Sequence, residues 1–373
     1  MSALTVVDIY SGVGGMSLGA ARAGFKLVGA IDHDPIPLEA HRINFPLVTH
    51  LERDAAESSG ADILRACGVD SVDGVIGGPP CQGFSFMGKR NPNDKRNDLF
   101  VQFYRLVSEI EPKFFVCENV PGILQKRYEG LRKRAEEELG SRYTILKPLV
   151  VDASEYGAPT ARTRVFFIGF RNHSGLKLAK ADFDTPKYLR RVTVKKALKG
   201  LPKKVPNGKF GRDEGWMKKT SSGSRAYFDR RVRGHIPAGV GDAASIALLH
   251  RKLVVSGFAE TVHSKEVVRR MKRLGSGEVD IVSKAVRLSQ SGYCPTLRAG
   301  TGKDKGSYQS LRPIHPTEHR VITPREAARL QGFPDWFQFH PSKWHSFRQI
   351  GNSVSPLVAE YLLGKIRIGL DQL

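Results

Sequence analysis

The sequence is poor in cysteine, with four in 373 residues. They are Cys67, Cys81, Cys117 and Cys294, and no two of them form a C-x-x-C pair. This spacing favours neither a disulfide scaffold nor a zinc site. We therefore expect a reduced, cytoplasmic protein that needs no metal.

Long apolar runs are also missing. No stretch approaches the roughly 20 apolar residues that a membrane-spanning helix needs, so we expect no membrane association. The chain starts Met1-Ser2-Ala3-Leu4 without a basic segment and reaches a charge at Asp8, which does not fit a secretory signal. With 40% hydrophobic residues it can still build a large core, and its length predicts two domains.

Acidic residues are scarce in one central block. Residues 171–312 include 32 Lys and Arg but 11 Asp and Glu, so this block carries nearly all of the formal net charge of +22. Glycine, proline, serine and scattered aromatic residues interrupt any regular periodicity there. This asymmetry indicates a polyanion-binding surface, most simply for nucleic acid. The alternative is a solvated basic face, which is less favoured because such faces promote nonspecific binding.

Outside this block, apolar strand-like runs alternate with helical segments. The strands are predicted at 4–10, 26–31, 73–77, 114–117, 143–151 and 165–170, and the helices at 16–23, 35–44, 61–67, 99–110, 125–139 and 356–368. Such alternation is typical of an α/β fold built on a largely parallel, buried sheet.

The first strand runs into a glycine turn, Ser11-Gly12-Val13-Gly14-Gly15, and then a helix. That order is typical of a nucleotide-binding loop, where backbone approaches a ligand at a helix N-terminus. The dinucleotide fingerprint G-x-G-x-x-G fails here because Ser17 stands at the third glycine position. Asp32 ends the second strand, where it either holds ribose hydroxyls or caps the helix that starts at Pro35.

A second turn, Gly77-Gly78-Pro79-Pro80-Cys81, places a thiol directly after a buried strand. Two glycines and two prolines make this turn stiff and exposed, which suits a nucleophile at the carboxyl end of a sheet. The alternative is a loop cysteine without a function. Glu118 ends another strand of the same predicted sheet, and its alternative role is to cap the following turn. Cys117 lies within that strand and is expected in the core.

Taken together, these segments resemble the DNA (cytosine-5)-methyltransferases, of the compact bacterial kind found in restriction-modification systems. Six motifs occur in the family's order: D-I-Y-S-G-V-G-G from Asp8, G-P-P-C-Q-G-F-S around Cys81, E-N-V from Glu118, R-T-R from Arg162, R-E-A-A-R-L-Q-G-F-P from Arg325 and G-N-S-V from Gly351. The resemblance implies a Rossmann-like, S-adenosylmethionine-dependent methyltransferase sheet with helices on both faces, plus a smaller irregular target-recognition domain. It divides the chain into a catalytic domain, residues 1–170 completed by 314–373, and a basic target-recognition domain, residues 171–313.

The same resemblance assigns the chemistry. Cys81 would add to carbon 6 of a flipped-out cytosine, which activates carbon 5 toward the methyl group of S-adenosyl-L-methionine. Glu118 would contact ring nitrogen 3, a role that requires a raised carboxyl pKa. Arg162 and Arg164 would hold the base.

Further residues are assigned to the methyl donor and to DNA. The donor set is Tyr10, Ser11, Gly12, Gly14, Gly15, Asp32, His33, Asp54, Pro80, Leu99, Asn352 and Val354, and the DNA set is Gln82, Ser85, Lys89, Arg90 and Arg96. The expected partner is double-stranded DNA, and we expect a monomer. The enzyme is either the modification partner of a cognate restriction endonuclease or an orphan methylase. The chain departs from the family twice, with Tyr10 in place of the usual Phe and Thr160 in place of the usual Gln before the arginine pair.

Three other functions remain open from the sequence. Methylation of cytosine in tRNA would use the same chemistry, although the long basic insert favours DNA. A dinucleotide oxidoreductase is suggested by the glycine loop, but Ser17 and the cysteine turn argue against it. A catalytically idle DNA-binding regulator fits poorly with the intact Cys81, Glu118 and arginine pair.

Overall fold

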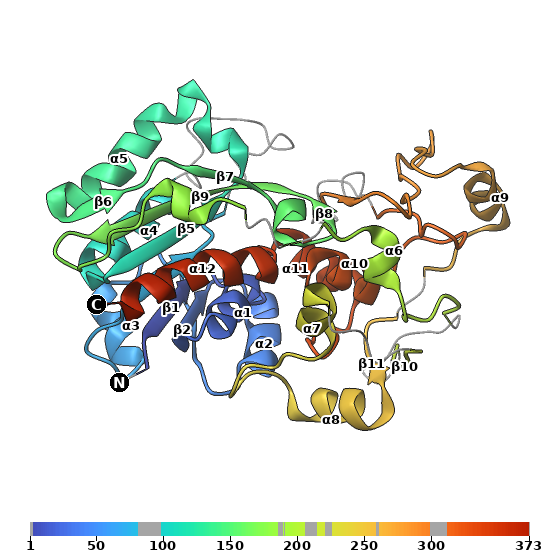
Figure 1. Cartoon of the computed structure of the whole chain (residues 1–373), viewed down its shortest axis with the longest axis horizontal. Helices are drawn as coiled ribbons and strands as arrows, with labels where there is room; N and C mark the ends of the chain where they lie inside the picture. Colours follow the sequence, from blue (N-terminus) through green and yellow to red (C-terminus); the bar gives the residue numbers. More distant parts are fainter. Residues whose placement is uncertain are drawn as a thin grey trace.

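A computed structural model describes residues 3–80, 98–185, 189, 191–205, 215–220, 226–258, 261–298 and 312–372. Cys81 and the five residues assigned to DNA from the sequence, Gln82, Ser85, Lys89, Arg90 and Arg96, lie outside this set. The structure is formed by a lobe built on a sheet and by a lobe of short helices and irregular chain (Figure 1).

The sheet lobe contains eight strands, in the order β3-β2-β1-β4-β5-β9-β6 with β7 also paired to β9. β1 to β5 are mutually parallel, and β9 runs antiparallel to β5, β6 and β7. The strands are β1 (Thr5–Ile9), β2 (Lys26–Asp32), β3 (Thr49–Glu52), β4 (Gly74–Gly77), β5 (Phe114–Asn119), β6 (Tyr143–Ile145), β7 (Leu149–Asp152) and β9 (Thr163–Arg171). The parallel half confirms the α/β fold predicted from the sequence.

Helices cover both faces of this sheet, as the resemblance implied. One face is covered by α1 (Gly15–Arg22), α2 (Pro35–Asn44) and α12 (Pro356–Asp371), and the other by α3 (Gly60–Ala66), α4 (Asp98–Ile110) and α5 (Glu129–Leu139). The buried apolar strand residues divide between two clusters, one on each face. The sheet is therefore a buried layer, which explains its continuous apolar strands.

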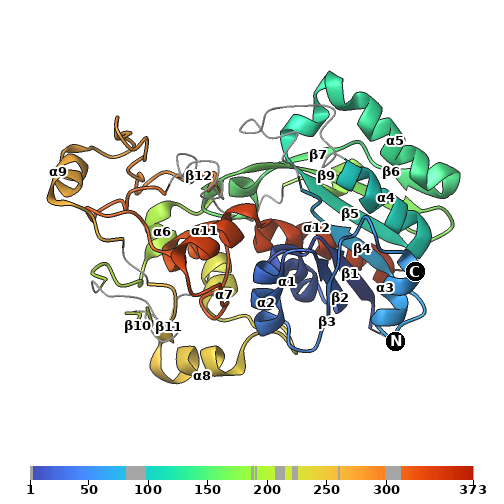
Figure 2. The same cartoon turned by 180° about the vertical axis from the view of Figure 1, so that it is seen from behind.

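The last helix, α12, returns to the first lobe and lies along α1 (Figures 1 and 2). The contact depends on small residues, because a Cβ added at Gly19 would lie 2.3 Å from the Cβ of Ala359. Residues at the two ends of the chain thus form one packed unit around the sheet.

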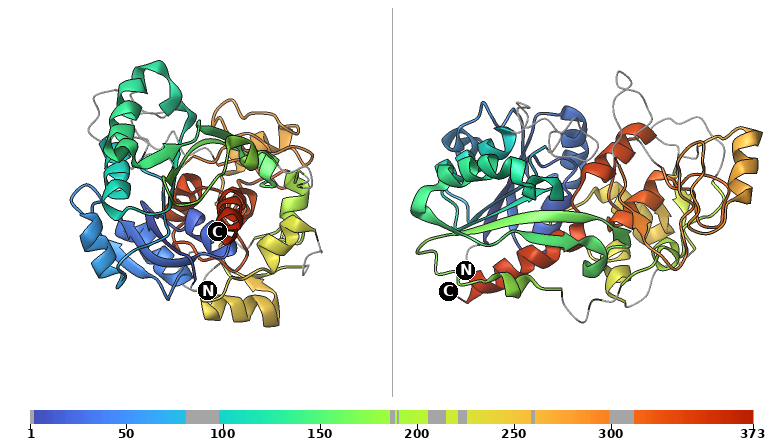
Figure 3. Two further views of the ribbon diagram at one scale, coloured as in Figure 1. Left: turned by 60° about the vertical axis from the view of Figure 1, so that its left-hand side comes forward. Right: turned by 90° about the horizontal axis from the view of Figure 1, so that it is seen from above.

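The second lobe is built from short elements around residues 194–352. They are α6 (Val194–Leu198), β10 (Met217–Lys218), α7 (Tyr227–Arg233), α8 (Ala243–Lys252), β11 (Val254–Val255), α9 (Lys265–Arg273), β12 (Cys294–Pro295), α10 (Pro324–Gln331) and α11 (Lys343–Asn352). Most of its buried apolar residues, including Phe228, Leu249, Phe258 and Trp336, continue the cluster on the α1–α12 face. Figure 3 shows this lobe extending from the sheet lobe, with α9 in orange at its outer end.

The lobe interior also holds charge. Asp335 accepts two hydrogen bonds from the Arg329 guanidinium, at 2.9 and 2.7 Å, and lies 3.1 Å from Lys219 Nζ, with all three side chains almost fully buried. Arg329 also donates to the carbonyls of Ala197 and Lys199 and so joins α10 to the basic block. Part of the positive charge counted in the sequence is therefore inside the protein.

Helix boundaries expected from the sequence agree with the structure to within one residue for α1, α2 and α3. Larger differences occur elsewhere: α5 begins at Glu129, four residues after its expected start, and α12 ends at Asp371, three residues after its expected end. The strand expected over 143–151 is two short strands, β6 and β7, that both pair with β9. Residues 349–352 belong to helix α11, which the sequence analysis did not predict.

Candidate active site

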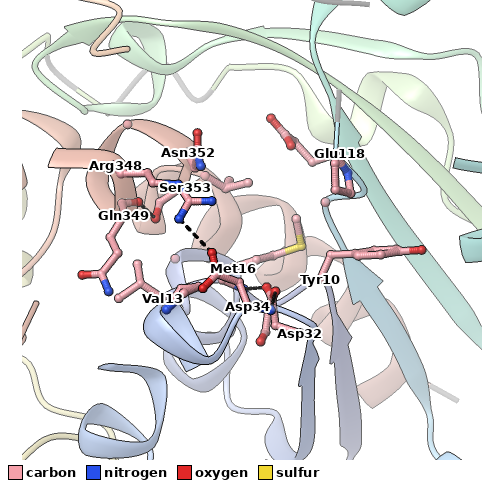
Figure 4. Close-up of a pocket in the computed structure, with 18 of the residues that line it drawn as sticks. Tyr10, Val13, Met16, Asp32, Asp34, Glu118, Arg348, Gln349, Asn352 and Ser353 are labelled. Carbon is pink, nitrogen blue, oxygen red and sulfur yellow. Dashed lines mark hydrogen bonds and ion pairs between the residues drawn. The ribbon is translucent and has the colours of Figure 1, made fainter. Parts of the chain in front are cut away.

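One pocket lies at the carboxyl ends of β1, β2, β4 and β5, closed on one side by α11. Twelve residues assigned from the sequence line it: Tyr10, Ser11, Gly12, Gly15, Asp32, His33, Pro80, Glu118, Arg162, Arg164, Asn352 and Val354. Figure 4 shows the residues of α11 facing Tyr10, Met16 and Asp32 across the pocket. The carboxyl edge of a parallel sheet is where such folds bind ligands, which explains why motifs from distant parts of the chain meet here.

The turn after β1 has the backbone conformation that its glycines allow. Gly12 and Gly14 have φ of +54° and +95°, in the left-handed region that side chains disfavour. A Cβ at Gly12 would meet nothing within 4 Å, so backbone is open to the pocket there. A Cβ at Gly14 would lie 2.5 Å from the ring of Phe45, so this glycine instead allows α2 to pack under the turn. Gly14 is not among the pocket-lining residues.

Asp32 is the acidic group at the end of β2, and both of its carboxylate oxygens accept backbone hydrogen bonds. Gly12 N donates at 2.8 Å and Asp34 N at 2.9 Å. The helix α2 is capped by Asp34, whose side chain accepts from Ile36 N, so the capping role belongs to Asp34 and not to Asp32. A hydrogen bond with Asp32 raises the pKa of His33. Asp32 is fixed at the pocket edge with lone pairs remaining for a ligand's hydroxyls.

The pocket offers further groups suited to an adenosine-type donor. Ser11 is buried, and its hydroxyl has no hydrogen-bond partner among the described residues. The Tyr10 hydroxyl donates to the carbonyl of Leu99 at 3.2 Å, which fixes the ring at the pocket wall. The side chains of Leu99 and Asp54 are not among the lining residues, and Asp54 is exposed and accepts a hydrogen bond from Ala56 N.

Sequence reasoning missed an ion pair at the pocket. Arg348 of α11 lies 2.8 Å from Asp34, the N-cap of α2, and joins the C-terminal segment to the donor loop region. Arg348, Gln349, Met16 and Asp34 all line the pocket. The position of Arg348 and Gln349 shortly before the G-N-S-V motif could have indicated that they also line the pocket.

Glu118 lies near the end of β5 and is paired with Arg164, with 2.8 Å between Oε1 and Nε. Burial raises the pKa of Glu118, while Arg164 and Arg162 lower it, and the net direction is upward. The carboxyl therefore keeps a proton to a higher pH than an exposed glutamate does. This is the property that donation to a ring nitrogen requires.

Arg162 is almost fully buried and joins three parts of the chain. Its guanidinium donates to the carbonyl of Gly351 at 2.8 Å and to that of Leu297 at 3.4 Å. The same side chain lines the pocket. The two arginines thus differ, since Arg164 contacts Glu118 whereas Arg162 holds the closing motif and the basic block in place.

Thr160, at the position where the family usually has Gln, has a defined contact. It lies in β8 (Thr160–Ala161), which pairs with β12, and its hydroxyl donates to the carbonyl of Cys294 at 3.1 Å. The threonine therefore helps to fasten the basic block to the strand that leads into the arginine pair.

Comparison with known proteins identifies the family. Residues 4–367 match the model of the C-5 cytosine-specific DNA methylases. The chain belongs to this family. It is 38% identical over 366 residues to the type II methyltransferase M.XorII of Xanthomonas oryzae, covering 96% of this chain and 84% of that one. It is 31% identical over 396 residues to the type II methyltransferase M.DdeI of Desulfomicrobium norvegicum, covering 97% and 88%.

Solved structures agree with this assignment. The methylase is similar to a putative DNA modification methyltransferase encoded within a prophage of E. coli, with 47% identity, a TM-score of 0.90, and coverage of 99% of this chain and 100% of that one. The S. pombe Dnmt2 methyltransferase, at 18% identity and a TM-score of 0.61 over 99% of both chains, shares the fold.

The protein is therefore a DNA (cytosine-5-)-methyltransferase, and its methyl donor is S-adenosylmethionine. The oxidoreductase alternative is wrong. In the described part of the chain, no helix has the length and apolar character needed to cross a membrane. Within the same residues, no group of three His, Cys, Asp or Glu side chains is arranged to hold a metal ion.

Proposed function

We propose that this methylase acts on a flipped-out cytosine in a specific duplex sequence through a transient bond between Cys81 and carbon 6. The observation that carries the proposal is the position of Glu118. Its carboxyl, with a raised pKa, lines the same pocket as Gly78, Pro79 and Pro80, the residues that lead directly to Cys81. The Asn119 side chain donates to the Pro79 carbonyl at 3.4 Å and links the two strand ends.

The chemistry then follows from these groups. The Cys81 thiolate forms a bond to carbon 6, and the electron pair of the 5,6 double bond becomes available at carbon 5. Glu118 donates its proton toward nitrogen 3, which neutralises the negative charge that builds on the ring. S-adenosylmethionine supplies the methyl group that carbon 5 takes up. Loss of the carbon-5 proton to a base, departure of the Cys81 sulfur as a thiolate and return of the nitrogen-3 proton to Glu118 then restore the neutral aromatic ring.

The residues present fit the donor. Open backbone at Gly12, the fixed carboxylate of Asp32 and the unpartnered buried hydroxyl of Ser11 are suited to the polar groups of an adenosine-type ligand. Tyr10 would stack on the adenine, and Asn352 and Val354 would complete the wall. Asp54 and Leu99 would contact the donor only from outside the pocket wall, because their side chains do not line it.

We further propose that the enzyme is the modification partner of a type II restriction system, because M.XorII and M.DdeI carry that description. In this proposal residues 171–313 form the target-recognition domain. Residues 1–170 with 314–373 form the catalytic domain, which therefore includes α10 and α11 of the second lobe. The protein would act as a monomer and share its recognition site with a cognate endonuclease.

The test is covalent trapping. In the presence of S-adenosylmethionine, 5-fluorocytosine in duplex DNA would be methylated at carbon 5 but could not lose its fluorine, so the adduct with Cys81 should accumulate and survive denaturing electrophoresis. The Cys81→Ala variant should give no adduct and no methylation, while a Cys67→Ala control behaves as the wild type. Bisulfite sequencing of a plasmid from expressing cells would identify the recognition sequence. Methylation of tRNA in place of duplex DNA, or full activity of Cys81→Ala, would overturn the proposal.

A further inference from the structure

One carboxyl in the donor pocket differs from the others because it has no positive partner. Among the described residues, four carboxyls line this pocket, and two of them form the ion pairs with arginines given above. Asp32 accepts hydrogen bonds from two backbone N–H groups and lies 3.4 Å from His33. The fourth, Asp8, has no ion pair within the described part of the chain, and its carboxylate accepts a hydrogen bond from Ser17 at 2.5 Å. Since buried carboxylates are normally paired, an unpaired one in a ligand pocket is a candidate partner for a ligand's positive charge.

The surroundings of Asp8 oppose its negative charge. The residue lies in β1, shortly before the donor turn, and is 1% exposed. Its neighbours in the sheet, Ala30 of β2 and Ile76 of β4, carry no charge. Asp32 repels a negative charge on Asp8, whereas the Ser17 hydrogen bond stabilises one. Burial is the largest influence and raises the pKa of Asp8 to about 7, so both forms of this carboxyl are populated near neutral pH.

Asp8 also has a hydrogen-bonded route for its proton. Ser17 Oγ lies 2.9 Å from His41 Nε2, and His41 Nδ1 lies 2.8 Å from Nε2 of His50, a partly exposed residue of β3. Burial lowers the pKa of both histidines, so both rings stay neutral around pH 7. When Asp8 is ionised, Ser17 donates to it and each histidine donates toward Ser17, and when Asp8 is protonated every donor points the other way. Each state keeps the three hydrogen bonds of this chain, and one proton leaves or enters at His50.

We propose that Asp8 is a specificity-determining residue of the donor site, whose carboxylate favours the positive sulfonium of S-adenosylmethionine over the neutral thioether of the by-product, S-adenosylhomocysteine. The inference rests on the proposed placement of the donor in this pocket. The two molecules share the adenosine group, the ammonium and the carboxylate, so a contact such as that of Asp32 binds both alike. Methyl transfer removes one positive charge from the ligand, and an unpaired carboxylate in the pocket responds to this change through Coulombic attraction.

Linkage makes the preference for the donor depend on pH. A positive charge in the pocket favours the ionised form of Asp8, and by reciprocity the ionised form binds the donor more tightly than the protonated form does. Because the pKa of Asp8 is about 7, the preference for donor over by-product should rise between pH 5.5 and pH 7.5. The rise should be about fivefold, the lower end of the usual coupling between two ligands. Ionised Asp8 thus helps the enzyme to exchange by-product for donor after each transfer.

A purely structural role for Asp8 predicts a different result. In that case the carboxyl would only hold Ser17 at the start of α1, and its replacement would change the affinities for both ligands equally. His33 and Glu118 also line the pocket and have a raised pKa, so they are the competing sources of pH dependence.

Calorimetric titration with each ligand, without DNA, measures the ratio of the two dissociation constants at pH 5.5, 6.5 and 7.5. Asp8→Asn can still accept from Ser17 but cannot ionise, so its ratio should stay at the low-pH value of the wild type. Ser17→Ala removes a hydrogen bond that lowers the pKa of Asp8, so the rise should move to higher pH. His33→Gln and Glu118→Gln should keep the rise. Titrations in buffers of different ionisation enthalpy should show proton release on donor binding that is absent in Asp8→Asn.

A wild-type ratio that does not change with pH, or an equal rise in Asp8→Asn, would overturn the inference. Loss of the rise in His33→Gln or Glu118→Gln would assign it to those groups instead. A Ser17→Ala profile identical to that of the wild type would also overturn it, which keeps the inference testable if Asp8→Asn does not fold. The placement of the donor is tested separately, because Asp32→Ala should weaken binding of both ligands alike. If Asp32→Ala weakens neither, the placement itself is wrong.

Discussion

Glu118 and Arg164 form an ion pair between two adjacent antiparallel strands, with Arg164 Nε 2.8 Å from Glu118 Oε1. Two opposed effects act on this carboxyl. Burial raises its pKa, and Arg164 and Arg162 lower it, with burial the larger. The arginines therefore adjust how readily Glu118 gives up a proton, and burial keeps that proton on the carboxyl to a higher pH than on an exposed glutamate.

Replacing Glu118 tests the proton-donating role. Glu118→Gln should lower kcat by about 10²- to 10⁴-fold, the usual contribution of general acid–base catalysis, while donor and DNA binding change little. Single-turnover methylation of a recognition duplex gives the rate. Glu129→Gln, on the surface helix α5, is the control and should leave the rate unchanged. A Glu118→Gln enzyme within threefold of the wild type would contradict the assignment.

Arg164 should set the pH range over which Glu118 works. Because Arg164 lowers the pKa of Glu118, Arg164→Gln should raise that pKa and move the alkaline limb of the kcat profile to higher pH. The whole profile should also fall, since the proposed mechanism has Arg164 hold the cytosine. The comparison is made as relative rates from pH 6 to 9. An alkaline limb that stays in place or moves to lower pH would show that Glu118 does not control it.

A hydrogen-bonded chain lies beneath the donor loop. Ser17 Oγ donates to Asp8 Oδ2 at 2.5 Å, lies 2.9 Å from His41 Nε2, and His41 Nδ1 lies 2.8 Å from His50 Nε2. Ser17 is the residue that breaks the dinucleotide fingerprint, and its hydroxyl has this structural role. Burial raises the pKa of Asp8 to about 7, although the Ser17 hydrogen bond opposes the shift.

The raised pKa of Asp8 predicts a pH-dependent stability. Between about pH 4 and pH 7 the unfolded chain has already lost this proton and the folded protein still holds it, so the free energy of unfolding falls as pH rises through this window. In Asp8→Asn this contribution is absent, and the loss of stability from pH 5 to pH 8 should be smaller by at least about 1 kcal/mol. Denaturant unfolding at the two pH values measures it, with exposed Asp371→Asn as the control. Parallel pH profiles for wild type and Asp8→Asn would contradict the raised pKa.

Much of the site could be predicted from the sequence because it depends on strand ends. Tyr10, Asp32, Pro80 and Glu118 each follow or end an apolar run, and parallel strands bring their carboxyl ends to one edge. Local patterns were sufficient for this. The start of helix α10 is also marked by a local pattern. Thr323 is its N-cap, Pro324 is its first residue, and Thr323 and Glu326 form a complete capping box in the structure.

The remainder depends on contacts between distant residues that leave no local pattern. The pairing of Arg348 with Asp34 joins residues more than 300 positions apart, and the bond from Thr160 to Cys294 joins two lobes. The count of Lys and Arg in the basic block also cannot show which side chains reach the surface. Lys219 is buried beside Asp335, whereas Lys272 is exposed on α9. The composition indicated the DNA-binding class, and only the structure distinguishes its internal cations from its outward ones.

The buried pair of Arg329 and Asp335 should be essential for the second lobe. Although burial alone would raise the pKa of Asp335, the Arg329 and Lys219 charges lower it to about 2. Asp335→Asn leaves these two buried cations without their counter-ion and should cost about 3 to 5 kcal/mol of unfolding free energy. The matched control is Asp371→Asn, which breaks an exposed pair with Arg367 and should cost less than about 0.5 kcal/mol. Equal stability of the two variants would show that the buried charges relax or hydrate.

Docking of the C-terminal helix on the donor-loop helix should depend on a single glycine. A Cβ at Gly19 of α1 would lie 2.3 Å from the Ala359 Cβ and 2.7 Å from the Glu360 backbone nitrogen, so α12 must move away. Overpacking of this kind typically costs about 1 to 3 kcal/mol. Gly19→Ala should therefore lower the free energy of unfolding and weaken binding of S-adenosylmethionine, since α1 begins at the donor turn.

Gly364 provides the matched control because it lies on α12 itself. A Cβ there meets nothing within 4 Å, so Gly364→Ala adds only helix propensity and should stabilise the protein by up to about 1 kcal/mol. Denaturant unfolding and calorimetric donor binding of both variants test the pair. We expect Gly19→Ala to lower the free energy of unfolding and Gly364→Ala to raise it. This result would show that packing of α12 on α1 maintains the donor turn, and that the intrinsic stability of either helix does not. Stabilisation by Gly19→Ala, with donor affinity unchanged, would show that the two helices are not tightly coupled.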